Sequence, residues 1–372
     1  MSKAKKEFVV LFPNCPNIGL VKDVGQIPYV LGKNYDDINT YLASCKIEIG
    51  GADYNRVEGM KIVQIPVILK NEIITGLVYI LKNAGKVDWF NFYHGGRRVY
   101  YWAKLYKFLN PKGKVYLKLD LNYDGCRKLS ESKKELKIFE KTAKAVDIVS
   151  VESEQIRELC KRFTDIDIEV ICNGYVDNTG IEATGESERE NCFITVGRLG
   201  TYEKATDLLL EAFAESAAEH DWKLKLVGSI EPAFMQQKEA FYQKYPQLKE
   251  RVIFTGPISD KKKLYEAYSS ARVFVLPSRY EGFPLVGPEA LHCGCRMILS
   301  DAVPPVKELT NNKAYGVVVK ANDVSSLKEA FVQESKRAYS DAEVHNIMQY
   351  AEKTLSWDKI CAHLYELMLE KM

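Results

Sequence analysis

The sequence has no apolar run long enough to cross a membrane. The longest candidate, residues 73–81, is about half of the roughly 18 to 20 residues that a spanning helix needs. The basic residues that precede the apolar run at 8–12 lack the apolar stretch and cleavage site of a secretory signal. These absences predict a cytoplasmic protein, with the inner face of a membrane as its location if part of its surface binds lipid.

Patterned cysteines and metal-ligand spacings are also missing. The nine cysteines are an odd number without a repeated spacing, which argues against a disulfide framework and a zinc ligand set. Cys293 and Cys295 flank a single glycine, a spacing unlike that of structural zinc sites. The Asp165-Ile166-Asp167 triplet resembles the Asp-x-Asp of metal-dependent transferases, but it leads into an apolar run at 168–171 and we discount it. We therefore expect neither a metal nor a cofactor.

The chain has little net charge, +2, but its charge is unevenly distributed. Residues 1–150 contain 25 Lys and Arg against 15 Asp and Glu, whereas the remainder contains 27 against 35. This asymmetry suggests that the first half meets an anionic surface or acceptor, and a solvated lysine-rich face is an equally weighted alternative. The near-neutral total argues against a nucleic-acid partner.

Short apolar and β-branched runs alternate with helical patterns along the 372 residues, which predicts parallel sheets. The expected strands are residues 8–12, 61–66, 87–92, 114–119, 147–151 and 168–171, then 192–196, 223–227, 252–254, 272–276, 296–299 and 316–319. A stretch rich in Thr, Gly, Ser and Glu at 177–191 separates the two series. The prediction is an α/β protein with two doubly wound, Rossmann-like domains, 1–177 and 178–353, and a C-terminal helix, 354–372.

Polar motifs in the second half directly follow expected strands. Gly197-Arg198, Gly228-Ser229 and Ser278 come after three of them, and ligands of such sheets bind beyond the carboxyl ends of the strands. Lys204 follows at the start of a helical pattern. A cation at this end opposes the helix dipole, so its presence there suggests a functional role. Arg198 and Lys204 together could hold a diphosphate, although they could also merely solvate a loop and a helix start.

Two glutamates flank a loop that leads into another helix. Glu281 stands before Gly282, and Glu289 follows Pro288, which is tolerated in the first helical turn. Free backbone N–H groups near Leu285 and Val286 would favour phosphate oxygens, while both glutamates can accept hydrogen bonds from hydroxyls. A nucleotide sugar offers both groups, whereas an acidic first helical turn alone would explain only Glu289.

In combination, Gly197-Arg198, Lys204 and the Glu281-x7-Glu289 pattern resemble glycosyltransferase family 4. The segments 149–153 and 173–177 and the Ser300-Asp301 pair are also similar, so the resemblance covers residues 145–372. It implies the GT-B fold, in which an acceptor-binding first domain and a nucleotide-sugar-binding second domain face a central cleft. It also implies that the C-terminal helix returns to the N-terminal domain. It further implies a nucleotide-sugar donor, with UDP favoured, no divalent ion, and retention of the anomeric configuration.

The resemblance also implies roles for individual residues of the second half. Arg198 and Lys204 would bind the diphosphate and assist catalysis, and Glu289 would bind the ribose hydroxyls. Glu281 would bind the donor sugar as a catalytic residue. The remaining donor-binding residues would be Gly197, Gly228, Ser229, Gly282, Phe283, Pro284, Leu285 and Val286.

The first half matches the family less well. Where members often have a Gly-Gly turn after the first strand, Lys22 and Gly25 stand here, and we expect Gly25 on the donor side and Lys22 on the acceptor side. Asp120 takes the place of a frequent histidine and is an expected catalytic and acceptor-binding residue. It could accept a hydrogen bond from a sugar hydroxyl or stabilise positive charge at the anomeric carbon, or it could simply cap a turn. His94, before Gly95-Gly96, is an expected acceptor-binding residue.

Aromatic and basic residues interleave at 97–109, which suits a helix at a membrane interface. An ordinary amphipathic helix that covers the sheet is the favoured explanation, and the two are compatible. Lysines at 128–144 extend this basic character into a second expected helix. The function predicted is a glycosyltransferase acting on a glycan or lipid-linked acceptor in cell-surface polysaccharide synthesis. A non-catalytic GT-B partner subunit and a GT-B sugar-nucleotide epimerase are the alternatives.

Overall fold

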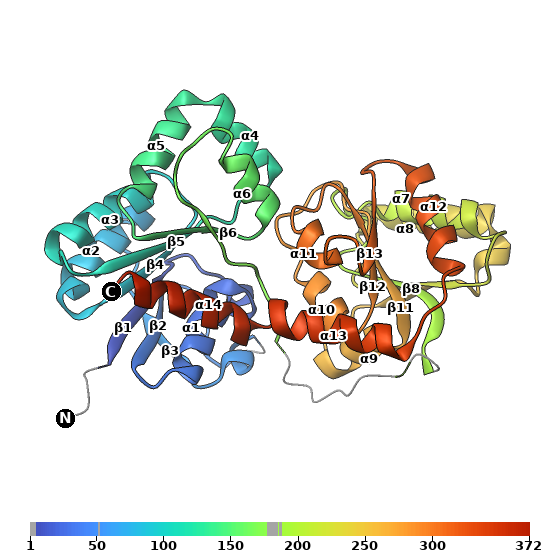
Figure 1. The fold of residues 1–372 in the computed structure, drawn as a ribbon, viewed down its shortest axis with the longest axis horizontal. Helices are drawn as coiled ribbons and strands as arrows, with labels where there is room; N and C mark the ends of the chain where they lie inside the picture. Colours follow the sequence, from blue (N-terminus) through green and yellow to red (C-terminus); the bar gives the residue numbers. More distant parts are fainter. Residues whose placement is uncertain (1–4, 51–52, 177–184, 186–187) are drawn as a thin grey trace. The chain divides into compact units, whose positions relative to one another are not determined.

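A computed structural model describes residues 5–50, 53–176, 185 and 188–372 (Figure 1). The chain divides into two compact units, one of residues 1–174 with 357–372 and one of residues 175–356. The sequence placed the first boundary between 177 and 178, a point outside the described residues, and the second at 353/354. Each unit contains one parallel sheet.

The first unit has a seven-stranded parallel sheet in the order β3-β2-β1-β4-β5-β6-β7. Its strands are β1 (Lys6–Leu11), β2 (Ile38–Ser44), β3 (Lys61–Gln64), β4 (Trp89–Tyr93), β5 (Lys114–Lys118), β6 (Ile148–Val151) and β7 (Glu169–Val170). Its helices are α1 (Asp23–Asn34), α2 (Glu72–Asn83), α3 (Arg97–Leu109), α4 (Tyr123–Glu131), α5 (Lys133–Ala143), α6 (Glu154–Cys160) and α14 (Trp357–Glu370), with short 3-10 turns η1 (Asn17–Val21), η2 (Tyr54–Val57) and η3 (Ala84–Lys86).

Helices cover both faces of this sheet. Val9 and Leu11 of β1 belong to a buried cluster with side chains of α2 to α6, whereas Phe8 and Val10 are buried on the opposite face. Helix α14 packs beside α1 (Figure 1). Tyr365 of α14 stacks on Tyr35 just after α1, with ring centroids 3.8 Å apart. The C-terminal helix therefore belongs to the N-terminal unit.

Two sequence expectations for this unit are wrong. The series of expected strands omits β2, where polar residues interrupt the apolar pattern; Thr40 and Ser44 are nevertheless buried, and Ser44 Oγ donates to the carbonyl of Pro13 at 3.1 Å. The single helix expected over 128–144 is two helices, α4 and α5. Ser132 separates them because its side chain accepts the amide of Glu135 and caps α5.

The second unit has a six-stranded parallel sheet in the order β10-β9-β8-β11-β12-β13. Its strands are β8 (Glu190–Val196), β9 (Lys223–Val227), β10 (Val252–Gly256), β11 (Ala271–Leu276), β12 (Arg296–Ser300) and β13 (Gly316–Val319). Its helices are α7 (Thr206–Ser216), α8 (Met235–Lys244), α9 (Lys261–Ser269), α10 (Val286–His292), α11 (Val306–Thr310), α12 (Val324–Ser335) and α13 (Asp341–Leu355), with 3-10 turns η5 (Pro232–Phe234) and η6 (Pro246–Leu248). Side chains of α7, α8 and α12 share a buried cluster with one face of this sheet.

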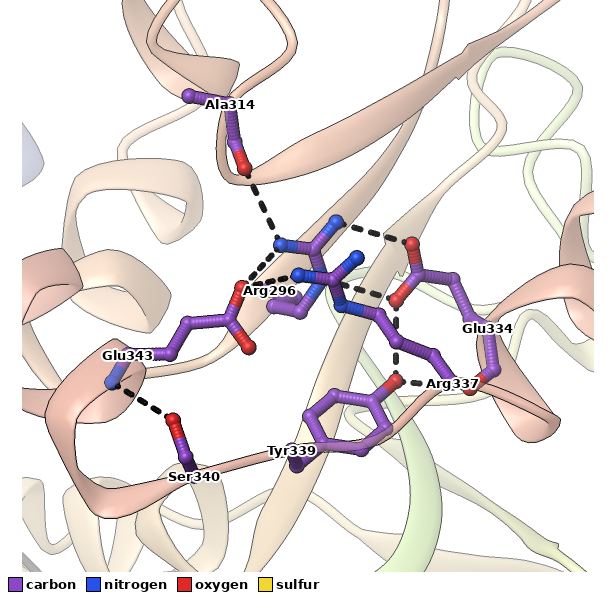
Figure 2. A network of polar contacts seen from close by, with 7 residues as sticks. All are labelled: Arg296, Ala314, Glu334, Arg337, Tyr339, Ser340 and Glu343. Carbon is purple, nitrogen blue, oxygen red and sulfur yellow. Dashed lines mark hydrogen bonds and ion pairs between the residues drawn. The ribbon is translucent and has the colours of Figure 1, made fainter.

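A charged network ties the first residue of β12 to two helices (Figure 2). Arg296 donates to both carboxylate oxygens of Glu334 in α12, at 2.9 and 3.1 Å, and to Glu343 in α13 at 2.6 Å. It also donates to the carbonyl of Ala314 at 3.2 Å, and the hydroxyl of Tyr339 donates to Glu334 at 2.9 Å. The network lies at the amino end of β12, so it stabilises the sheet edge opposite the expected site.

Candidate active site

The strand order of the second unit reverses between β8 and β11. In open parallel sheets the loops that leave such neighbouring strands diverge, and the crevice between them beyond the carboxyl ends binds ligands. The loop after β8 carries Arg198 and Lys204, and the loop after β11 carries Glu281. The residues singled out from the sequence therefore lie at this topological switch point.

Lys204 and Glu281 form an ion pair across the two loops. Lys204 Nζ lies 2.6 Å from Glu281 Oε1, and both side chains are largely buried. Ser278 Oγ donates to the same carboxylate oxygen at 2.8 Å, which fixes the orientation of Glu281. An ammonium has three N–H donors and Glu281 takes one of them, so the pair is suited to receive a further anionic oxygen.

Arg198 is oriented differently. Its side chain is 65% exposed and pairs with Glu203, so in this structure Arg198 and Lys204 contact two different carboxylates. The next residue, Leu199, donates its amide to the carbonyl of Ser229 at 2.8 Å. The loop that carries Arg198 thus runs beside the loop after β9, where Ser229 is exposed.

Gly228 is required by the close approach of its loop to the backbone of Gly197. The amide of Gly197 donates to the carbonyl of Val227 at 3.0 Å, and a Cβ at Gly228 would lie 1.8 Å from the carbonyl oxygen of Gly197. Gly228 also has a φ of +144°, which favours glycine. Backbone packing alone therefore explains Gly228, independently of the nucleotide contact expected there.

The segment after Glu281 leads into α10. Gly282, Phe283, Leu285 and Val286 are partly exposed, whereas Pro284 is buried and its carbonyl accepts the amide of Gly287 at 3.0 Å. This amide is therefore already satisfied inside the turn. Leu285 and Val286, the two positions from which free amides were expected, are the residues that precede and begin the helix.

Glu289 of α10 pairs with Lys261, the first residue of α9. The sequence analysis missed Lys261. Its signal is a run of three lysines, Lys261 to Lys263, at a helix start capped by Asp260, where cations oppose the helix dipole. The same reasoning that singled out Lys204 would have found it. Each of the two glutamates predicted for the site, Glu281 and Glu289, thus pairs with a lysine.

In the first unit the strand order reverses between β1 and β4. His94 follows β4 and Asp120 follows β5; their side chains are about half exposed, and His94 Nδ1 lies 3.9 Å from Asp120 Oδ2. Both residues have left-handed backbone conformations, with φ of +56° and +51°. Such conformations are costly for residues with side chains and concentrate at functional sites.

A buried ion pair supports Asp120, and the sequence analysis missed it. Lys118 and Glu152 have side chains 0% and 3% exposed, and Lys118 Nζ lies 3.3 Å from Glu152 Oε1. Glu152 accepts the amides of Asp120 and Leu121 at 3.1 and 3.3 Å, while Lys118 donates to the carbonyl of Ile171 at 2.6 Å. Burial raises the pKa of Glu152 to about 7, and the charge of Lys118 opposes this rise. The available signal was a lysine within an apolar strand.

The start of α1 adds another buried carboxylate. Lys22 is exposed, whereas Asp23 beside it is buried, and burial raises the pKa of Asp23 against the opposing charge of Lys118. Gly25 is buried inside α1, and a Cβ there would lie 2.3 Å from the carbonyl oxygen of Leu20. Packing inside the unit therefore requires a glycine at this position.

The aromatic and basic helix at 97–109 is α3, and it has two kinds of surface. Trp102 and Tyr106 are buried against the sheet, which confirms that the helix covers the core, whereas Tyr101 and Phe108 are exposed. Within the described part of the chain, no helix is long and apolar enough to cross a membrane. The same residues contain no group of three or more His, Cys, Asp or Glu arranged to hold a metal ion.

A protein-family model matches the second unit. The model of the family described as Glycosyl transferases group 1 matches residues 177–354. These residues are thus similar to that family, and we call them the group 1 domain. The switch-point pair of Lys204 and Glu281, the exposed Arg198 and the second pair of Glu289 with Lys261 all lie within this group 1 domain.

Among relatives, the uncharacterized glycosyltransferase MJ1607 of Methanocaldococcus jannaschii is 25% identical over 249 residues, 62% of each chain. The lipopolysaccharide core biosynthesis mannosyltransferase LpcC of Rhizobium leguminosarum is 32% identical over 160 residues, 41% of this chain and 42% of the relative. The chain thus spans less than two thirds of the length of these curated relatives.

Solved structures extend the similarity to the whole chain. Anabaena Alr3699/HepE in complex with UDP superimposes with a TM-score of 0.72 at 14% identity, over 98% of this chain and 100% of that one. The lipopolysaccharide outer core galactosyltransferase WaaB gives a TM-score of 0.72 at 16% identity, over 98% and 100%. This likeness and the two parallel sheets confirm the predicted fold class, two Rossmann-like units of the GT-B type.

Proposed function

We propose that the chain is a glycosyltransferase that moves a sugar from a nucleotide diphosphate, with UDP favoured, to a glycan or lipid-linked acceptor. The observation that carries the proposal is the Lys204–Glu281 pair at the switch point of the group 1 domain. The similarity to HepE, which was solved with UDP and with UDP-glucose, supports the nucleotide. The names of LpcC and of the amylovoran biosynthesis glycosyltransferase AmsD of Erwinia amylovora support a role in cell-surface polysaccharide synthesis.

In the proposed reaction the departing diphosphate gains negative charge, which cations can stabilise. Lys204 would turn part of its donor capacity from Glu281 to a phosphate oxygen, and the exposed Arg198 would join it by exchanging Glu203 for phosphate. These cations would make a divalent ion unnecessary. Glu281 would accept a hydrogen bond from a sugar hydroxyl, and transfer would retain the anomeric configuration, as in glycosyltransferase family 4.

The first unit would bind the acceptor. His94 and Asp120 can bind hydroxyls beyond β4 and β5, and the carboxylate of Asp120 can stabilise the positive charge that develops at the anomeric carbon. Ile18, Ile49, Val67 and Leu69 are exposed in the segments that follow β1, β2 and β3, at the same sheet edge. Exposed apolar groups at this edge suit a lipid-linked acceptor.

Contact with anionic lipid belongs to the same proposal. Helix α3 exposes Tyr101 and Phe108 together with Lys104, and α5 exposes several lysines. Aromatic rings and lysines on one helix favour a membrane interface at the inner face of a membrane. Liposome co-sedimentation tests it: binding should increase with the fraction of acidic lipid and decrease in Phe108→Ser, and binding independent of acidic lipid would refute it.

The decisive experiment is a panel of UDP-, GDP- and ADP-sugars tested in EDTA for thermal stabilisation and for slow hydrolysis. Wild type is compared with Lys204→Ala, Glu281→Ala and a matched control, Lys223→Ala, whose lysine pairs with Glu190 at the opposite edge of the same sheet. We expect one class of donor to stabilise and react with wild type and the control, and Lys204→Ala to lose the reaction. No response to any donor would favour a non-catalytic partner subunit, and release of an epimer would favour an epimerase.

A further inference from the structure

Arg279 joins three loops of the group 1 domain through its guanidinium group. Nη1 donates to the carbonyl of Tyr202 at 2.8 Å, in the loop after β8. Nη1 and Nη2 donate to the two carboxylate oxygens of Asp207, in the first turn of α7, at 3.1 and 2.6 Å. Nε donates to the side chain of Asn322, after β13, at 2.8 Å. Every nitrogen of the guanidinium therefore donates at least one hydrogen bond.

The backbone of Arg279 continues this connection. Its amide donates to the carbonyl of Glu203 at 2.8 Å. Glu203 directly precedes Lys204, and Arg279 stands two positions before Glu281. The two members of the switch-point ion pair therefore each lie within two residues of a bond made by Arg279.

A lysine could not replace these contacts. The guanidinium is a rigid planar fork, and it binds the carboxylate of Asp207 through two nitrogens while its third nitrogen points to Asn322. Its plane also lies over the ring of Tyr202, with 4.5 Å from Cζ to the ring centroid. Only about a tenth of the side chain is exposed, so water replaces these bonds poorly.

We propose that Arg279 is a positioning residue for sugar transfer, which sets the spacing of Lys204 and Glu281 by holding the loops after β8 and β11 together. The proposal rests on the proposed function, because it assigns to Arg279 the geometry of that same site. Arg279 acts through Lys204 and Glu281, since its own guanidinium is occupied by Tyr202, Asp207 and Asn322.

The test uses Arg279→Lys and, as a variant that leaves the arginine in place, Asp207→Asn. The matched control is Arg251→Lys. Arg251 is also partly buried, and it lies just before β10, at the opposite edge of the sheet. It donates to the carbonyls of Trp222, Ala217 and His220. Two quantities are measured for each full-length protein: kcat and KM for hydrolysis of UDP-glucose, and hydrogen exchange of the ligand-free protein over residues 198–207 and 278–284.

We expect Arg279→Lys to lower kcat by up to about a hundredfold, because a 1 Å misplacement of a catalytic group can cost that much, with KM for UDP-glucose near the wild-type value. Asp207→Asn should cause a smaller decrease of the same kind. Both variants should exchange faster at 198–207 and 278–284, and Arg251→Lys should change neither kcat nor these amides.

An unchanged kcat, or unchanged exchange in both loops, would overturn the proposal. A decrease in kcat that Arg251→Lys matches would also overturn it, because the cause would then be general destabilisation. If wild type does not hydrolyse UDP-glucose, UDP-glucose is not its donor, and the exchange measurements alone then decide whether Arg279 holds the loops.

Discussion

Lys204 and Glu281 are 77 positions apart in the sequence, yet Lys204 Nζ lies 2.6 Å from Glu281 Oε1. Two loops that leave neighbouring strands in opposite directions meet through this contact. A side chain that is paired before the donor arrives is already desolvated and oriented. It can therefore stabilise new negative charge with little reorganisation.

Replacing Lys204 by alanine should remove this stabilisation. Loss of one such charge-stabilising group typically costs about 3 to 4 kcal/mol, so turnover should fall by roughly a hundredfold or more. Glu281→Ala should lower turnover as well, and the double variant should lose little beyond the worse single one, because the two groups act as a unit. Steady-state kinetics of the four proteins measures this, and near-normal turnover of Lys204→Ala would refute the assigned role.

The buried Lys118–Glu152 pair should depend on both partners. Lys118→Met leaves the Glu152 carboxyl in the core without its cation, and breaking a buried pair in this way costs about 3 to 5 kcal/mol of unfolding free energy. Adding Glu152→Gln should restore much of that loss, since no unpaired charge then remains. Chemical denaturation of the full chain compares the variants. A single variant as stable as wild type would show that the pair is not needed for stability.

His220 should make the stability of the second unit depend on pH. Burial, assisted by the charge of Arg251, lowers the pKa of His220 to about 4. Its Nδ1 lies 3.2 Å from the amide nitrogen of Trp222, which donates to it, so protonation of Nδ1 would break this bond. The unfolded chain binds a proton near pH 6.5 and the folded chain only near pH 4. Stability is therefore fully present above about pH 6.5 and is lost as the pH falls towards 4, by at most about 3 kcal/mol.

The control for this effect is His220→Gln, which cannot titrate. The melting temperature of the variant should change less between pH 6.5 and pH 4 than that of wild type, and the difference isolates the contribution of His220. Parallel curves for the two proteins would contradict the prediction.

The network around Arg296 allows one arginine to be compared with two partners of different burial. The side chain of Glu334 is 1% exposed, whereas that of Glu343 is 16% exposed. Glu334→Ala should cost about 3 to 5 kcal/mol of unfolding free energy, because it leaves a buried guanidinium short of an acceptor. Glu343→Ala should cost about 1 kcal/mol. Equal losses would show that burial does not decide the strength of these bonds.

The sequence predicted which site residues follow the ends of strands. Strand ends are marked by the change from apolar to polar residues, so the positions of Arg198, Lys204 and Glu281 beyond β8 and β11 could be derived from alternation of strands and helices. Pairing between side chains could not be derived in this way. That Lys204 contacts Glu281 while Arg198 contacts Glu203 depends on loop conformations that leave little trace in residue spacing.

The residues that were missed share a physical character. Lys118 and Glu152 are charged groups buried within or directly after strands, where a sequence pattern leads one to expect apolar side chains. The two residues lie on or just after neighbouring strands of the sheet, but they are more than thirty positions apart in the chain. The strand β2 was missed for a related reason, because Thr40 and Ser44 are polar in sequence but buried in the fold.

Helix α14 completes the first unit although it follows the second unit in the chain. Tyr35 and its neighbours on α1 receive their partners, among them Tyr365, only when residues 357–372 have left the ribosome. During synthesis the N-terminal unit must therefore wait, with this surface uncovered, while the whole group 1 domain is translated. Chaperones that bind exposed apolar surface have their longest opportunity on the first half of the chain, and a ribosome that stalls within α13 would release a protein whose earlier unit is the unfinished one.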